Sequence, residues 1–281
     1  MSAKLKMNFK AIAVAAAILS GMFSLGLAHG EVVQCGTTTC SSSFSLDFAG
    51  TTSVGTGELL YDATSGAISL NTDLGTTTGN VKTAGGGLMW TMGDGSTITV
   101  GALSGNADPI LGFGLGASTT GSASTTGSTF GFTFNLPIAL QGPINADSSI
   151  SYSLSSFSAA GAHIAPVTGS NILSAFEVDT SVGGLTSLNK GVDVGSTFFF
   201  TGGPTPATQN SPVFTASNSF TGDLAYDLMT VKVDFSLSAN SAVGLSGFVQ
   251  QVAVVPIPAA VWLFGSGLLG LIGIARRKKA A

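Results

Sequence analysis

Strict alternation of apolar and polar side chains between residues 229 and 237 is the feature that most restricts the fold. Every second position there is apolar: Met229, Val231, Val233, Phe235 and Leu237. A period of two places these side chains on one face of a β-strand and the intervening polar ones on the other. We therefore expect a half-buried strand with one face in a core.

Shorter segments repeat this signal between turn residues. Residues 88–92 and 96–100 flank Gly93-Asp94-Gly95, and Asp-Gly accepts the positive φ angles of a tight hairpin turn. Further strand-like runs cover residues 59–61, 67–70, 130–134, 150–157, 198–200 and 248–255. Since no run has the length and period of an ordinary helix, the sequence predicts an all-β antiparallel sandwich or a barrel-like ectodomain.

Composition agrees with many short strands and turns, because glycine accounts for 39 residues and charged residues for only 9%. We predict one exported β-rich domain over residues 29–253. Within it, the low-complexity Ser/Thr/Gly run at 117–129 is expected to be a flexible loop or a linker between two subdomains.

The N-terminal segment has the pattern of a secretory signal peptide. Lys4, Lys6 and Lys10 precede an apolar stretch that ends with small residues at Gly26 and Ala28, the positions that a signal peptidase inspects. Residues 1–28 are therefore predicted to be removed after export. An uncleaved N-terminal anchor is the alternative, and it also exports the domain after it.

The C-terminal segment has the pattern of a transmembrane helix. Residues 259–275 carry no charge, and as a helix they would extend about 25 Å, enough to cross a thin hydrocarbon core. Four cations follow directly and are predicted to stop transfer on the cytoplasmic side: Arg276, Arg277, Lys278 and Lys279. A buried core helix is the alternative, but it leaves these cations unexplained.

A five-residue motif precedes this predicted helix: Val255, Pro256, Ile257, Pro258 and Ala259. Together with the helix and the basic end, it resembles a PEP-CTERM sorting signal of the VPLPA-like variant along residues 254–279. The resemblance implies processing by exosortase in the inner membrane, with the C-terminus cytoplasmic beforehand, and then display at the cell surface or release. Extracellular polysaccharide is the second partner it implies.

The eponymous Pro-Glu-Pro is Pro-Ile-Pro here, so an enzyme that reads the Glu carboxylate has nothing to bind. Residues 254–281 thus form the predicted sorting segment.

Charge excludes one class of partner. All fourteen acidic residues lie between Glu31 and Asp234, where only Lys82, Lys190 and Lys232 oppose them. Such a domain repels polyanions, so nucleic acid is not expected as a partner.

The two cysteines, Cys35 and Cys40, follow an export signal and are predicted to form a small disulfide loop. A zinc site would need further ligands, for which only His29 and His163 are available. The acidic pairs Glu177 with Asp179 and Asp223 with Asp227 could bind calcium, but no known calcium-loop spacing surrounds them and we expect solvated carboxylates. No metal or cofactor is predicted.

No motif commits the chain to catalysis. A G-x-S-x-G elbow is absent, and Ser187 with Lys190 forms an S-x-x-K match without its companion motifs. The G-x-G-x-x-A match at 112–117 is followed by a Ser/Thr/Gly run instead of a helix, so it does not predict a dinucleotide site.

The sequence therefore favours a non-enzymatic surface or matrix protein with a structural or adhesive role. A carbohydrate-binding module is the alternative, in which Tyr61, Trp90 or Tyr152 would stack on sugars, although their place in alternating strands also suits core packing. A secreted hydrolase is a third hypothesis, and it requires His163 beside a Ser and a carboxylate in a concave pocket.

Overall fold

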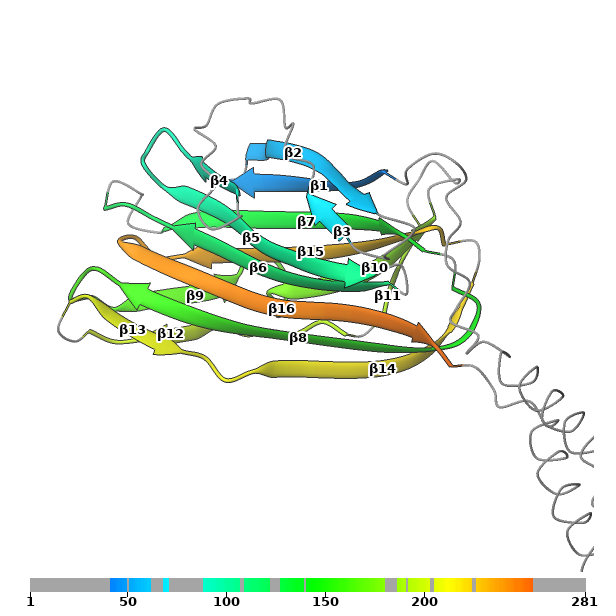
Figure 1. The fold of residues 1–281 in the computed structure, drawn as a ribbon. Helices are drawn as coiled ribbons and strands as arrows, with labels where there is room; N and C mark the ends of the chain where they lie inside the picture. Colours follow the sequence, from blue (N-terminus) through cyan, green and yellow to red (C-terminus); the bar gives the residue numbers. More distant parts are fainter. Residues whose placement is uncertain are drawn as a thin grey trace, which may run out of the picture.

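The computed structural model describes residues 41–49, 51–61, 68–70, 88–106, 109–121, 127–138, 140–179, 186–190, 192–202, 205–223 and 226–254. These residues form sixteen strands and no helix, arranged as two antiparallel sheets packed face to face (Figure 1). The all-β prediction is confirmed, and the architecture is a sandwich of two separate sheets.

The larger sheet, called the β7 sheet here, has nine strands. Its main path runs in the order β11 (Thr186–Asn189), β10 (Leu173–Asp179), β15 (Leu228–Leu237), β7 (Ser128–Pro137), β1 (Ser41–Phe48), β2 (Thr51–Tyr61) and β3 (Ile68–Leu70). Beyond the end of β10, β15 pairs instead with β9 (Ala162–Pro166), which in turn pairs with β12 (Phe198–Phe200).

The other sheet, called the β8 sheet, has seven strands. Its order is β13 (Ala207–Asn210), β8 (Gly142–Ser156), β16 (Ser241–Ala253), β6 (Ile110–Ser118), β5 (Thr97–Asn106) and β4 (Leu88–Thr91). β14 (Phe214–Gly222) pairs with β8 on the same side as β13, so these two strands together form one edge of the sheet.

Phenylalanine side chains fill much of the space between the sheets. Phe235 of β15 stacks with Phe130 and Phe132 of the neighbouring β7, at ring-centroid distances of 5.5 and 6.2 Å. Phe134 of β7 reaches across to Phe113 of β6 in the opposite sheet, at 6.2 Å. All five apolar residues of the alternating segment 229–237 are 0% exposed, so the predicted half-buried strand is confirmed.

The turn chemistry predicted from sequence is also found. β4 and β5 pair around Gly93-Asp94-Gly95, where Gly95 has a φ of 84° and the Asp94 carboxylate accepts a hydrogen bond from the Ser96 amide at 2.8 Å. Leu59 pairs with Leu70 in the β2–β3 ladder, so the strand-like runs predicted at 59–61 and 67–70 lie side by side.

The predicted linker at 117–129 is shorter than the sequence suggested. β6 continues to Ser118, the Thr119 amide bonds the Ser241 carbonyl at 2.8 Å, and β7 begins at Ser128. The low-complexity composition concealed these ends because serine and threonine fit strands as well as loops. Residues 122–126 lie outside the described residues. Since β6 and β7 contribute to the same core, the run joins two layers of one sandwich.

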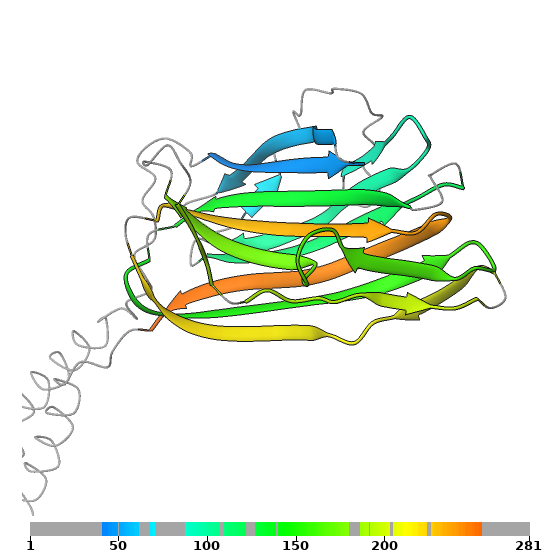
Figure 2. The ribbon, with the colours of Figure 1, turned by 180° about the vertical axis from the view of Figure 1, so that it is seen from behind.

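Several turns meet at one end of the sandwich, which we call the tip. There β8 turns into β9 and β15 turns into β16, next to the ends of β6 and β12 (Figure 1; Figure 2). From the tip, β16 runs the length of the molecule to the opposite end. Its thirteen residues at about 3.3 Å each separate the two ends by roughly 40 Å.

Candidate functional site

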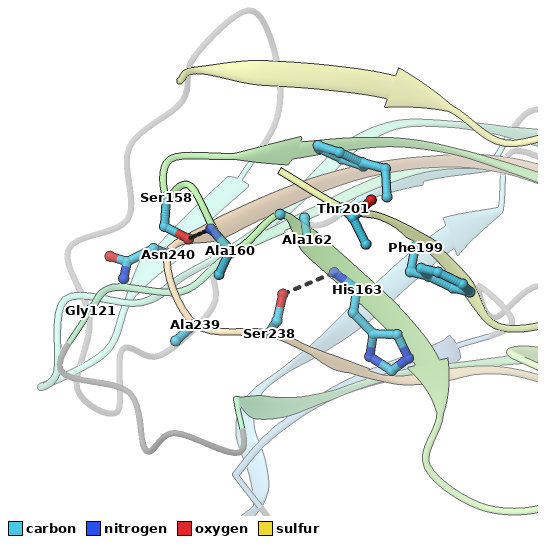
Figure 3. Close-up of a pocket in the computed structure, with 12 residues that line it drawn as sticks. Gly121, Ser158, Ala160, Ala162, His163, Phe199, Thr201, Ser238, Ala239 and Asn240 are labelled. Carbon is cyan, nitrogen blue, oxygen red and sulfur yellow. Dashed lines mark hydrogen bonds between the residues drawn. The ribbon is translucent and has the colours of Figure 1, made fainter. Parts of the chain in front are cut away.

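A pocket of about 480 Å³ opens at the tip (Figure 3). It is called the tip pocket, and its lining comes from four places in the chain: Gly121, Ser158, Ala160, Gly161, Ala162, His163, Phe199, Phe200, Thr201, Ser238, Ala239 and Asn240. None of these twelve residues is Asp, Glu, Lys or Arg. The lining therefore offers neutral polar groups and apolar surface, with His163 as its one titratable side chain.

An exposed aromatic ring stands at one side of the pocket. Phe199 of β12 pairs with His163 of β9 in the antiparallel ladder, and their rings lie 6.5 Å apart. Alternation along β12 directs Phe200 into the core at 7% exposure, and so leaves Phe199 outside at 62%. Full burial of a phenylalanine side chain contributes roughly 1.5–3 kcal/mol, so the exposed Phe199 ring offers apolar surface for a ligand to cover.

Hydrogen bonds fix the β15–β16 turn against β9. The His163 amide donates to Ser238 Oγ at 2.9 Å, and the Ser238 amide donates to the His163 carbonyl at 3.0 Å. The Asn240 carbonyl accepts from the Phe157 amide at 2.8 Å, which ties the turn to β8 as well. These bonds hold the pocket wall in place before any ligand arrives.

Asn240 adopts a left-handed backbone conformation with a φ of 51°. Asparagine tolerates this region better than most residues, so Asn240 suits the tight turn between β15 and β16. Its side chain lies against Gly121, where an added Cβ would come within 2.8 Å of Asn240 Oδ1. Gly121 therefore leaves the room that the Asn240 amide occupies.

Three polar groups of the lining are available to a ligand. Within the described residues, no hydrogen bond engages the side-chain amide of Asn240, the Thr201 hydroxyl or the His163 ring. An amide supplies donors and acceptors at once, and a hydroxyl does the same on a smaller scale. Beside an exposed ring, such groups suit a neutral ligand that carries hydroxyl groups and apolar faces.

The aromatic residues singled out from sequence do not form this site. Trp90 is 4% exposed and packs edge-on to Phe44 at 6.4 Å, while Tyr152 is 2% exposed and stacks on Phe214 at 5.3 Å. Burial raises the pKa of Tyr152 far above its usual range. Both are core residues, so neither can stack on a sugar. The side chain of Tyr61 lies outside the described residues.

The signal that could have found Phe199 is the run of three phenylalanines at 198–200, since a strand cannot bury three consecutive side chains on one face. Asn240 and Ser238 had no comparable signal, because the turn that carries them becomes part of a pocket only through tertiary pairing with β9.

The hydrolase hypothesis asks for His163 beside a serine and a carboxylate. His163 is exposed on β9, and the Ser238 hydroxyl accepts from its backbone amide. No carboxylate belongs to the lining of the tip pocket. The pocket thus lacks the acid that would orient a histidine base and the pair of carboxylates used in most glycoside hydrolysis.

A second hollow of about 450 Å³ lies on the outer face of the β8 sheet. Ser151, Ser153, Gly244 and Ser246 form part of it, and Val213 borders it at 66% exposure. Its one aromatic lining residue is Tyr152, which is buried, so this hollow offers no ring to a ligand.

The prediction of solvated acids is wrong at Glu177 and Asp179, which are 1% and 8% exposed. Glu177 Oε2 lies 2.6 Å from Lys190 Nζ, and Lys190 is also only 1% exposed. Sequence reasoning missed this pair because Glu177 lies on β10 whereas Lys190 follows the end of β11, and only the folded sheet brings them together. The same contact accounts for Lys190 of the S-x-x-K match, and residues 112–117 of the glycine motif lie in β6.

Within the described residues, no group of three or more His, Cys, Asp or Glu side chains could hold a metal ion. The same part of the chain contains no helix long and apolar enough to cross a membrane. Cys35 and Cys40, the motif at 255–259, the basic residues 276–279 and the predicted signal peptide lie outside the described residues.

No protein-family model matches the chain, and no curated protein matches it significantly. Among solved structures, it has partial similarity to the CBM22-1 xylan-binding domain of Paenibacillus barcinonensis Xyn10C, at 12% identity and a TM-score of 0.23, covering 59% of this chain and 87% of that one. A family 11 carbohydrate-binding module from Clostridium thermocellum gives 14% identity and a TM-score of 0.24, covering 60% and 87%. The enzymatically active domain of bacteriophage CBA120 tailspike protein 4 gives 11% identity and a TM-score of 0.28, covering 57% of this chain and 18% of that one. TM-scores at this level leave fold and function to be argued from the residues themselves.

Proposed function

We propose that this chain is an exported, non-catalytic surface protein that attaches to extracellular polysaccharide through the tip pocket. The observation that carries the proposal is the exposed Phe199 ring beside three polar groups that no described residue engages in a hydrogen bond, in a pocket whose lining residues include no carboxylate. A sugar ring presents an apolar C–H face to an aromatic ring and hydroxyl groups to amides and hydroxyls around it. Attachment of this kind is also how an adhesive matrix protein would act.

The position of the pocket suits such a role. The tip lies at the opposite end of the sandwich from Val254, where the described chain ends, and β16 connects the two (Figure 1). If the C-terminal segment is held in the membrane before processing, as the sequence predicts, the pocket lies at the other end of β16, about 40 Å from the end of the sandwich that leads to the membrane. A ligand outside the cell would then have free access.

Binding of the producing cell's own exopolysaccharide tests the proposal. The Phe199→Ala variant is expected to weaken binding roughly 2- to 12-fold, since an aromatic contact contributes about 0.5–1.5 kcal/mol. Phe157→Ala is the matched control, because Phe157 is 56% exposed but does not line the pocket. Isothermal titration of the three proteins would refute the site if both variants bind like the parent, or if the parent binds no glycan.

Sorting is a separate part of the proposal and has its own test. In a producing cell with its processing enzyme, we expect the protein to lose residues 1–28 and the segment beyond about residue 258. Intact-mass measurement of membrane and medium fractions reads both cuts. A C-terminus that stays intact in membranes would make the protein a permanently anchored one and would contradict the exosortase assignment.

A further inference from the structure

β14 is the outermost strand of the β8 sheet along one edge. All nine of its residues, Phe214–Gly222, pair with β8 in continuous register, and no other described strand pairs with it (Figure 1; Figure 2). One side of its backbone is therefore bonded within the sheet, and the other faces outward.

The register shows which backbone groups face outward. The Ser211 amide donates to the Tyr152 carbonyl, and the Tyr152 amide donates to Ser211 Oγ, so even-numbered residues of β8 direct their backbone toward this edge. Ile150 pairs with Phe214, so the even-numbered residues of β14 form the backbone hydrogen bonds to β8. Its odd-numbered residues direct their amides and carbonyls away from β8.

These outward residues are Thr215, Ser217, Ser219 and Thr221. Their side chains are exposed, and the Ser219 amide donates to its neighbour Asn218 Oδ1 at 2.9 Å. Within the described residues, no hydrogen bond engages the outward amides of Thr215, Ser217 and Thr221. The edge thus presents a row of donors and acceptors at the spacing of a β-ladder.

β14 is held firmly from its inner side. The Phe220 ring lies 4.0 Å below Lys190 Nζ, which is itself paired with buried Glu177, and Asn218 Nδ2 donates to the Lys190 carbonyl. An edge strand fixed in this way does not have to become ordered before it pairs, which lowers the entropic cost of association.

Natural edge strands commonly carry charges, prolines or bulges that prevent pairing with another chain. β14 has the sequence FTASNSFTG, without charge or proline, and its register with β8 has no bulge. Because the domain as a whole is acidic, a second copy is repelled over most of the surface but not along this neutral strand.

We propose that two copies of this chain pair antiparallel through β14 and join their β8 sheets into one continuous sheet. A second copy fits the edge because antiparallel pairing of one strand with itself is isologous: each outward amide faces a carbonyl of the same strand in the partner. This inference does not depend on the tip pocket, which lies on other elements.

Analytical ultracentrifugation of the purified full chain over a range of concentrations tests the pairing. Ser217→Pro deletes an outward amide without removing a bond to β8, and the two hydrogen bonds lost per dimer should weaken association about 30-fold. Ser217→Thr keeps the amide and suits a strand, so it should associate like the parent. A parent that stays monomeric, or a Ser217→Pro variant that associates like the parent, would overturn the proposal.

Hydrogen exchange on the unmodified chain gives an answer even if Ser217→Pro fails to fold. The amides of Thr215, Ser217 and Thr221 should exchange fast in dilute solution and become protected as concentration rises. Fast exchange at every concentration, or protection that does not change with concentration, contradicts pairing through this edge.

Discussion

Replacing Lys190 by methionine should destabilise the protein strongly at neutral pH and weakly in acid. Methionine keeps a long apolar side chain but removes the ammonium group, which faces the buried Glu177 carboxylate and lies over the rings of Phe220 and Tyr226. Burial is the main cause that raises the pKa of Glu177 above its ordinary 4.5, with Asp223 adding to it and Lys190 opposing it. Without Lys190, the pKa of Glu177 rises further and the carboxyl takes up a proton instead.

The cost of that proton sets the magnitude. Protonating a carboxyl of ordinary pKa 4.5 at pH 7 costs at most about 3.4 kcal/mol, which is 2.5 pH units at 1.36 kcal/mol each. The parent, in which the pKa of Glu177 is already raised, bears part of this cost. This limit agrees with the 3–5 kcal/mol typical of breaking a buried pair from one side. A group whose folded-state pKa is raised contributes stability below its unfolded pKa and loses it as pH rises. The destabilisation should therefore fall from a limit of about 3 kcal/mol at pH 7 to below about 1 kcal/mol at pH 5.

Urea denaturation followed by circular dichroism at both pH values measures this difference. Lys232→Met is the matched control, because Lys232 is 42% exposed and pairs with Asp234 at 2.5 Å on the surface. An exposed pair contributes under about 1 kcal/mol, so this variant should change little at either pH. A Lys190→Met effect that is below about 1 kcal/mol at pH 7, or that does not shrink at pH 5, would refute the reasoning.

Two further substitutions test the packing of the sandwich. Gly127→Ala should destabilise by well over about 2 kcal/mol, since an added Cβ would lie 2.1 Å from the Leu237 carbonyl oxygen. Gly142 has the same φ of 81° but open space around it, so Gly142→Ala should cost only the roughly 1–2 kcal/mol of a left-handed alanine. Thermal unfolding of the two variants separates collision from conformational strain, and equal losses would contradict the assignment. Trp90→Ala should cost about 3–5 kcal/mol of stability, because the ring is buried against Phe44, yet leave glycan affinity unchanged in the folded fraction. Lost affinity with unaltered stability would restore Trp90 as a binding residue.

Local patterns predicted the elements better than the way the elements meet. The alternation at 229–237 and the Asp94-Gly95 turn each depend on neighbours in sequence, and both are found in β15 and in the β4–β5 hairpin. The burial of Trp90 and Tyr152 follows from their alternating positions, but which face of each strand meets the other sheet is decided by the whole sandwich. Sequence alone therefore left core packing and sugar stacking both open.

The candidate site and the buried ion pair could not be predicted, for a physical reason. Ser238 and His163 lie 75 residues apart, and a β-ladder between β9 and β15 brings them together. Glu177 and Lys190 belong to a domain so rich in acids that a solvated carboxylate was the natural expectation. Long-range pairing sets these contacts, and no periodicity within one segment reports it.

The most direct test of polysaccharide binding is to map where a ligand contacts the protein. Oligosaccharides from the producing bacterium's exopolysaccharide would be titrated into isotope-labelled protein while backbone amide signals are followed by NMR. Saturable shifts at His163, Phe199, Thr201 and Asn240, with those around Val213 unchanged, are the predicted result. Shifts confined to the hollow on the β8 sheet, or no saturable shift at all, would contradict binding at the tip.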